Sequence, residues 1–221
     1  MRLYIVRHGE TNLNKEKRLQ GRQNEPLNQT GVDLAIETGK GLKDVHFDMA
    51  IASPLVRAYD TARLILSQNN TSSNLIISVD PRLMEINWGS WDKKICRGDL
   101  YEVPIPQDEF NKFYNDSFNF CGAPDGETIT EVCERTKPFL DDLIKDTSLK
   151  DKTILVAMHG CSMRGLLNPL YNDPSDFWHG HVPANCAVNI VDIKDGKASI
   201  IEEDKIYYDP SLVIDVYTDK K

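Results

Sequence analysis

The sequence predicts an α/β fold in which helices cover both faces of a mostly parallel sheet, a three-layer αβα sandwich. Short apolar runs alternate with stretches of helical periodicity along most of the 221 residues, which is typical of strands joined by crossover helices. The run at 153–158 is continuously apolar, as expected of a central parallel strand. Residues 1–221 are expected to form a single domain, because a chain of this length can bury one sizeable core.

The individual elements are predicted from local patterns. Residues repeated at helical spacing, such as Leu34, Thr38 and Leu42, indicate helices. Thr30 and Ser53 are residue types that favour the N-cap of a helix. The expected order is strand 4–6, polar loop 12–28, helix 31–43, strand 47–52, a helix that starts sharply after Ser53-Pro54, strand 75–79, helix 128–145, strand 153–158, helix 162–167 and strands 187–193 and 198–203.

Residues from about 95 to 127 interrupt this alternation and are expected to form a cap over the sheet. Prolines punctuate this cap insertion, and its aromatic residues are expected to pack mainly into a small core of their own. Most of its charged residues are acidic, which favours a substrate with an uncharged or cationic organic group. The aromatic residues are Tyr101, Phe110, Phe113, Tyr114, Phe118 and Phe120, and the acidic ones are Asp99, Glu102, Asp108, Glu109, Asp116, Asp125 and Glu127.

Composition and charge argue against several classes of function. The net charge of −8 and the sequence pI of about 5.1 disfavour nucleic acid as a partner, because phosphate backbones need a basic surface. No apolar run is long enough to span a bilayer, and the first strand begins close to Met1, so a cytoplasmic protein without membrane contact is expected. Five scattered cysteines without a C-x-x-C pair predict neither a disulfide framework nor a zinc site.

Two histidines follow two of the predicted strands at the point where each strand ends. Arg7, His8 and Gly9 come after the first strand, and His159 and Gly160 come after the strand at 153–158. Ligands bind beyond the carboxyl ends of parallel strands, and neighbouring strands lie about 4.8 Å apart, so the two imidazoles are expected to meet. A neutral imidazole can attack phosphorus while a guanidinium binds the phosphoryl oxygens, which predicts phosphoryl-group chemistry.

Other polar residues are expected to face the same crevice. Arg57 lies in the first turn of the second predicted helix, where a cation placed against the helix dipole indicates an anionic ligand. Asn14, Gln20 and Gly21 belong to the polar loop, which is expected to close over an anion. Glu85 lies among apolar and aromatic residues, surroundings that favour a protonated carboxyl group able to donate to a leaving oxygen.

Taken together, these residues resemble the motifs of the histidine phosphatase superfamily, the phosphoglycerate mutase-like proteins, over most of the chain. The resemblance implies a phosphoglycerate mutase-like fold and a phosphomonoester hydrolase of the histidine acid phosphatase type. The matching segments, in order, are Arg7-His8-Gly9-Glu10-Thr11 with Asn14, Leu27-Asn28-Gln29-Thr30-Gly31, Ser53-Pro54-Leu55-Val56-Arg57-Ala58-Tyr59-Asp60-Thr61-Ala62, Glu85, Gly126-Glu127-Thr128 and His159-Gly160.

The resemblance also implies a role for each matched residue. His8 would become phosphorylated, Arg7 and Arg57 would hold the phosphoryl group, His159 would be the second histidine of the phosphate pocket, and Glu85 would be the proton donor. Positive charge from Arg7, Arg57 and His159 would stabilise the transferring group, and the two guanidiniums would keep His8 neutral. The implied substrate is a small phosphorylated metabolite, and the scheme needs no metal or other cofactor.

Two alternatives to hydrolysis stay open. The mutase branch of the family carries an arginine pair in its insert and a glycine-rich run after the proton donor, whereas this insert is acidic. The pattern favours a phosphatase over a cofactor-dependent phosphoglycerate mutase, although Lys93 and Lys94 would partly replace the missing arginines. The second alternative is a non-catalytic phospho-ligand-binding module, for which cations alone would suffice. A homodimer is also left open.

Two other chemistries fit the sequence poorly. A cysteine phosphatase would need cysteine directly after histidine and arginine six positions beyond it, whereas Cys161 follows glycine and position 167 is leucine. His179-Gly180-His181 is compatible with metal binding, but partner carboxylate or cysteine ligands are not indicated nearby.

Overall fold

The computed structural model describes residues 1–213, so positions 214–221 of the expected domain lie outside the described residues. A six-stranded sheet with the order β3-β2-β4-β1-β5-β6 forms its centre. Strands β1 to β4 run parallel to one another, whereas β5 is antiparallel to both β1 and β6. The predicted mostly parallel sheet is therefore confirmed. The strands are β1 (Arg2–Arg7), β2 (Met49–Ala52), β3 (Ile77–Val79), β4 (Thr153–Met158), β5 (Val188–Lys194) and β6 (Lys197–Lys205).

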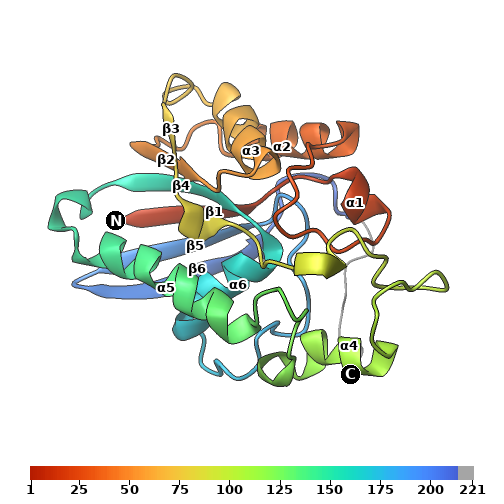
Figure 1. Ribbon diagram of the computed structural model, residues 1–221. Helices are drawn as coiled ribbons and strands as arrows, with labels where there is room; N and C mark the ends of the chain where they lie inside the picture. The colour runs from red at the N-terminus through yellow and green to blue at the C-terminus, as the bar shows by residue number, and fades with distance from the viewer. Residues whose placement is uncertain (214–221) are drawn as a thin grey trace.

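Helices cover both faces of this sheet, as Figure 1 shows. Helices α2 (Gln29–Gly41) and α3 (Val56–Ser67) lie on one face, and α5 (Ile129–Lys145) and α6 (Gly160–Leu167) lie on the other. Successive residues of β1 point to opposite faces, so Leu3 and Ile5 pack into the core under α5 and α6 while Tyr4 and Val6 pack into the core under α3. The expected three-layer αβα sandwich is confirmed.

The helices on the α2 and α3 face begin at residues other than those predicted. The N-cap of α2 is Asn28, whose side chain accepts a hydrogen bond of 2.9 Å from the Gly31 N–H, and not Thr30. Asn28 is held in this place because its amide group also donates to the Glu10 carboxylate at 2.7 Å. Helix α3 begins at Val56 without a side-chain cap. Within residues 1–213 no helix is both long enough and apolar enough to cross a bilayer.

The predicted polar loop contains a short helix, α1 (Asn12–Lys15). A capping box between Thr11 and Asn14 stabilises its first turn. Four residues are too few to show an apolar periodicity, which is why the sequence pattern does not predict this helix. Short 3₁₀ helices make up many of the connections, at Pro81–Leu83, Gly89–Trp91, Ser117–Asn119, Thr147–Leu149, Asn168–Leu170 and Pro210–Leu212.

The cap insertion contains one α-helix, α4 (Gln107–Asn115), which lies beside the sheet and away from α2 and α3 (Figure 1). Its buried Phe110 and Phe113 pack on each other and on Phe120. Phe113 also contacts Trp178, which comes from the segment between α6 and β5. The aromatic side chains therefore form a core of the cap insertion, as expected, and this core also joins the cap to the rest of the molecule.

Candidate active site

The two histidines meet at one edge of the sheet. Strands β1 and β4 are adjacent and parallel, with Arg7 opposite Met158, so the next residues, His8 and His159, leave the sheet side by side. The centroids of their imidazole rings are 5.1 Å apart, and both residues are buried. The predicted meeting of the two imidazoles is confirmed.

The local structure fixes the orientation of His8. Its Nδ1 lies 2.7 Å from the Gly9 carbonyl oxygen, which can only accept, so Nδ1 carries the hydrogen and Nε2 keeps its lone pair. Burial, together with the nearby Arg57 and Arg7 guanidiniums, holds the pKa of His8 well below 6.5. His8 is therefore a neutral imidazole with a free Nε2 lone pair, the form that can act as a nucleophile.

His159 is held by Ser53, for which the sequence pattern predicts only the role of a helix cap. Its Nε2 lies 2.8 Å from the Ser53 hydroxyl group, and Ser53 follows β2, the strand on the other side of β4. Burial and the nearby Arg57, His8 and Arg7 hold the pKa of His159 well below 6.5. His159 is thus neutral, and it contributes hydrogen bonding where positive charge was expected.

The two arginines are buried and fixed by backbone carbonyls. Arg57 has no exposed surface and donates to the carbonyl oxygens of Gly21 and Gln23, each at 2.7 Å. Arg7 donates to the carbonyl oxygen of Pro183. Burial lowers the pKa of Arg57 to about 10, so this guanidinium is still charged at neutral pH. Both side chains are held in place by neutral carbonyl groups, which do not compensate their charge.

Four buried polar atoms at this site have no hydrogen-bond partner among residues 1–213. They are Arg7 Nε, Gln20 Nε2, Arg57 Nε and His159 Nδ1, and the sequence predicted a site role for all four residues. Leaving a buried donor unpaired costs about 1–3 kcal/mol, so a cluster of them is uncommon in a fold that has no ligand to satisfy it. The arrangement suits a ligand that offers several acceptor oxygens, such as a phosphoryl group.

Glu85 is held by the beginning of α6. Its Oε1 accepts from the Ser162 N–H at 2.9 Å and its Oε2 from the Cys161 N–H at 3.1 Å, and Oε1 also accepts from the Ile86 N–H at 2.9 Å. Two of these N–H groups, those of Cys161 and Ser162, belong to the first turn of α6. Backbone N–H groups in a first turn have no partner inside their own helix. Glu85 is buried and lines the same cavity as Arg7 and His8, so the structure brings it to the predicted place.

The remaining predicted residues divide into two groups. Asn14, Gln20 and Gly160 line the cavity together with His8. Gly21, Arg57 and His159 are not among the wall residues; the Gly21 N–H donates to the Asp92 carboxylate at 2.9 Å and the Gly21 carbonyl accepts from Arg57. A Cβ atom at Gly21 would lie 2.5 Å from the Ile86 carbonyl oxygen, so only glycine fits there. In the structure Gly21 supports Arg57, and a ligand contact of Gly21 stays a prediction.

Three further cations belong to the cavity wall, of which the sequence pattern indicated only Arg18, as a donor of the polar loop. Lys17, Arg18 and Arg97 line it, whereas Lys93 and Lys94 do not. Among the residues described, the only carboxylate of the wall is that of Glu85, and none of the acidic residues of the cap insertion lines the cavity. This placement removes the basis for expecting an uncharged or cationic organic group on the substrate. The aromatic residues of the wall are Trp88, Phe113, Tyr114 and Trp178.

His179 and His181 make contacts outside this cavity. His181 Nε2 lies 2.8 Å from Asp204, which also pairs with the buried Arg164 at 2.6 Å. The His179 ring stacks on Tyr171 with ring centroids 3.6 Å apart. No cluster of three or more histidine, cysteine or acidic side chains suited to a metal occurs within the described part of the chain. The two histidines belong to an ion-pair and stacking cluster on α6 and β6.

Known proteins are similar to this chain in sequence. The chain is 35% identical over 160 residues to the fructose-2,6-bisphosphatase TIGAR of Xenopus tropicalis, covering 70% of this chain and 55% of that protein. It is 28% identical over 191 residues to the 2,3-bisphosphoglycerate-dependent phosphoglycerate mutase of Methanosarcina mazei, covering 75% and 78%. The chain therefore spans about half the length of the TIGAR relatives and most of the mutase.

A solved structure gives the same result for the fold. The alpha-ribazole phosphatase of Shigella flexneri superposes with a TM-score of 0.77 at 26% identity, covering 93% of this chain and 96% of that one. The family model of the histidine phosphatase superfamily (branch 1) matches residues 3–203, which include every residue of the site described above. The relatives comprise both phosphatases and mutases. The match to the family model shows that the chain belongs to the histidine phosphatase superfamily.

Proposed function

We propose that the protein hydrolyses phosphomonoesters of small metabolites through a phosphorylated His8. The observation that carries this proposal is the cluster of unpaired buried donors on Arg7, Gln20 and Arg57 beside a neutral imidazole with a fixed tautomer. The cavity volume of about 130 Å³ lies below the roughly 300 Å³ at which typical ligand pockets begin. A small substrate therefore fits better than a large one.

The reaction requires two transfers of the same phosphoryl group. In the first, His8 Nε2 attacks phosphorus, the bond to the ester oxygen breaks, and the carboxyl proton of Glu85 passes to that leaving oxygen. In the second, water attacks the phosphorus of phosphohistidine, the Glu85 carboxylate takes a proton from the water, and the P–N bond breaks. The products are an alcohol and inorganic phosphate, and both His8 and Glu85 return to their starting forms.

Charge and geometry support these assignments. Arg7 and Arg57 bring two fixed guanidiniums to the equatorial oxygens, which is the main requirement of phosphoryl transfer. In this scheme the unpaired Nδ1 of His159 carries the ring hydrogen and donates to the phosphoryl group, while Nε2 accepts from the Ser53 hydroxyl group. Three N–H groups hold the carboxyl group of Glu85 at the wall of the same cavity as His8, where the proposed scheme places the leaving oxygen.

Turnover of 4-nitrophenyl phosphate tests the proposal against a non-catalytic binding module. A hydrolase releases 4-nitrophenol and inorganic phosphate in equal amounts and over many cycles. A binding module protects the fold against heat when inorganic phosphate is added but releases neither product. The second outcome would overturn the proposal.

We propose further that the organic part of the substrate carries a second anionic group. Lys17, Arg18 and Arg97 line the cavity, and Glu85 is its only carboxylate among residues 1–213. Arg18 also pairs with Glu16 at 2.8 Å and with Glu102 at 3.0 Å. These three cations of the wall together are assigned to the second anion.

Matched pairs of substrates test this assignment. The wild type is expected to prefer 3-phosphoglycerate to glycerol 3-phosphate and phosphoserine to phosphoethanolamine. In the Arg97→Ala variant, kcat/KM for the carboxylate member of each pair should fall by about 10-fold to 100-fold, the worth of a charged hydrogen bond, and the other member should be unaffected. Lys112→Ala is the control, because Lys112 pairs with Glu109 in the same cap insertion but does not line the cavity. Equal preference in the wild type would contradict the assignment.

An anion-binding wall also favours mutase chemistry as a second candidate. A phosphoglycerate carries the required carboxylate, and a mutase returns the phosphoryl group from His8 to another hydroxyl of the same substrate. The two candidates are separated by supplying 3-phosphoglycerate together with a bisphosphorylated primer. Release of inorganic phosphate identifies the phosphatase, and the appearance of 2-phosphoglycerate identifies the mutase.

The low pKa of His8 predicts that the enzyme keeps its nucleophile in weakly acidic solution, as an acid phosphatase-type enzyme needs. Because burial and two guanidiniums place this pKa well below 6.5, His8 stays unprotonated at pH values where an ordinary imidazole already takes up a proton. The nucleophile is lost only when the pH falls through the lowered pKa. Nitrogen NMR of the imidazole measures this directly, and a protonation midpoint of His8 at 6.5 or above would contradict the prediction.

A further inference from the structure

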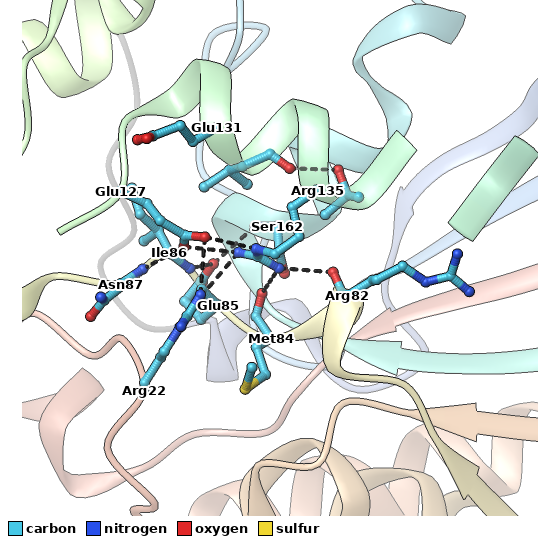
Figure 2. A network of polar contacts seen from close by, with 12 residues as sticks. Arg22, Arg82, Met84, Glu85, Ile86, Asn87, Glu127, Glu131, Arg135 and Ser162 are labelled. Atoms are coloured by element: carbon cyan, nitrogen blue, oxygen red, sulfur yellow. Dashed lines mark hydrogen bonds and ion pairs between the residues drawn. The ribbon is translucent and has the colours of Figure 1, made fainter. Parts of the chain in front are cut away.

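The loop that carries Glu85 is held from outside the cavity by one arginine of α5. Arg135 donates to the carbonyl oxygens of Arg82 at 2.8 Å, Met84 at 2.9 Å and Glu85 at 3.4 Å. Figure 2 shows its guanidinium between this loop and Glu127. Arg135 does not line the cavity, so any effect on the reaction must pass through the residues that it holds.

Glu127 completes this arrangement. Its carboxylate forms a two-bond ion pair with Arg135, at 2.8 and 3.0 Å. It also accepts from the Asn87 N–H at 2.8 Å, while the Glu127 N–H donates to the Asn87 carbonyl at 2.8 Å. Burial opposes ionisation, but the Arg135 guanidinium keeps the pKa of Glu127 below its usual value. The ion pair of Glu127 and Arg135 therefore holds the backbone on both sides of Glu85.

The same carboxylate reaches the loop that supports the phosphate arginine. Arg22 donates to Glu127 at 3.0 Å, and the neighbours of Arg22, Gly21 and Gln23, provide the two carbonyls that hold Arg57. Figure 2 shows Arg22 approaching Glu127 from the side opposite to α5. One ion-pair network thus joins the loop that holds Arg57 to the loop that carries Glu85. In the proposed reaction Arg57 binds the phosphoryl group and Glu85 protonates the leaving oxygen, so the two residues act on the two ends of the bond that breaks.

We propose that Arg135 and Glu127 are positioning residues that set the placement of Glu85 for proton transfer, with Arg22 coupling it to the loop that holds Arg57. This inference rests on the proposed function, in which Glu85 is the proton donor. The side chain of Glu85 is oriented by the N–H groups of Cys161 and Ser162, while Arg135 fixes its backbone. A displacement of about 1 Å in such a group can cost about 100-fold in rate.

Leaving groups of different basicity distinguish positioning from general stabilisation. The 4-nitrophenolate ion leaves without a proton, whereas an alkoxide needs one. For Arg135→Lys, which keeps the charge but loses the planar fork, we expect kcat/KM for an alkyl phosphate to fall by about 10-fold to 100-fold. The value for 4-nitrophenyl phosphate should change by less than about 3-fold. Glu127→Gln should produce the same split and serves as the second variant in case Arg135→Lys does not fold.

Two reference variants make the outcome decisive. Arg2→Gln breaks a similar two-bond pair, with Asp192 at 2.6 and 3.0 Å, at the far end of β1, and should change neither rate. Glu85→Gln should show a larger split in the same direction. Equal losses on both substrates, or no loss, in the Arg135 and Glu127 variants would overturn the inference. Absence of any split in Glu85→Gln, or of turnover in the wild type, would instead overturn the proposed function.

Discussion

The His8→Ala variant is expected to lose turnover of every phosphomonoester by at least about 10⁴-fold, because the nucleophile is removed and nothing at the site replaces it. His159 does not take over this role in the proposed scheme, because its Nε2 is engaged by Ser53 at 2.8 Å and its Nδ1 carries the hydrogen donated to the phosphoryl group. Steady-state release of inorganic phosphate from 4-nitrophenyl phosphate measures the loss. A His8→Ala protein that keeps more than about one-tenth of the wild-type rate would contradict the assignment.

Controls for this variant separate chemistry from folding. His8→Asn retains more of the side-chain volume and should be equally inactive. Thermal unfolding reports whether either variant has lost the fold. His46→Ala removes an exposed histidine, which contacts Thr71 and not the site, and should keep the wild-type rate.

The Arg57→Lys variant is expected to lower kcat/KM by about 10²-fold to 10³-fold, the usual worth of one fixed donor to a developing oxyanion. The guanidinium of Arg57 holds the Gly21 and Gln23 carbonyls with its two terminal nitrogens and still has Nε unpaired among residues 1–213. A single ammonium group has neither the reach nor the planar geometry to do both. Affinity for inorganic phosphate, measured as product inhibition, should fall in parallel.

The control for Arg57 lies on the same helix. Arg63 is an exposed residue of α3 that pairs with Asp60 at 3.1 Å, and Arg63→Lys should leave both rate and phosphate affinity unchanged. A drop of less than about 3-fold in Arg57→Lys would show that this guanidinium does not bind the phosphoryl group.

The sheet and the meeting of the two histidines could be predicted from the sequence because both depend on local patterns. An apolar run such as 153–158 identifies a central strand, and a histidine after each of two adjacent parallel strands can only lie at one edge. The first residues of α2 and α3 were harder to predict from the sequence. Asn28 caps α2 in place of Thr30 because the Glu10 carboxylate binds the Asn28 side chain. The Ser53 hydroxyl group contacts His159 and is not the N-cap of α3. Both outcomes depend on contacts with distant parts of the chain.

The walls of the site depend even more on long-range pairing. An isolated bridge between Arg18 and Ile95, with the Cys96 N–H donating to the Lys17 carbonyl at 3.0 Å, brings the polar loop against the start of the cap insertion. This pairing places Lys17 and Arg97 on the same cavity, and no sequence pattern marks it. The acidic residues of the cap insertion are likewise paired over long range, Glu102 with Arg18 and Glu127 with Arg135, and none of them lines the cavity.

The most direct test of the account is to trap the phosphorylated protein during turnover. Rapid quenching in alkali preserves a phosphorus–nitrogen bond, and mass spectrometry of the digested chain then locates the phosphate. The account predicts an acid-labile phosphate on His8 that forms within one turnover and is absent from His8→Ala. Multiple turnovers with no phosphorylated chain at any quench time, or a phosphate found on another residue, would contradict it.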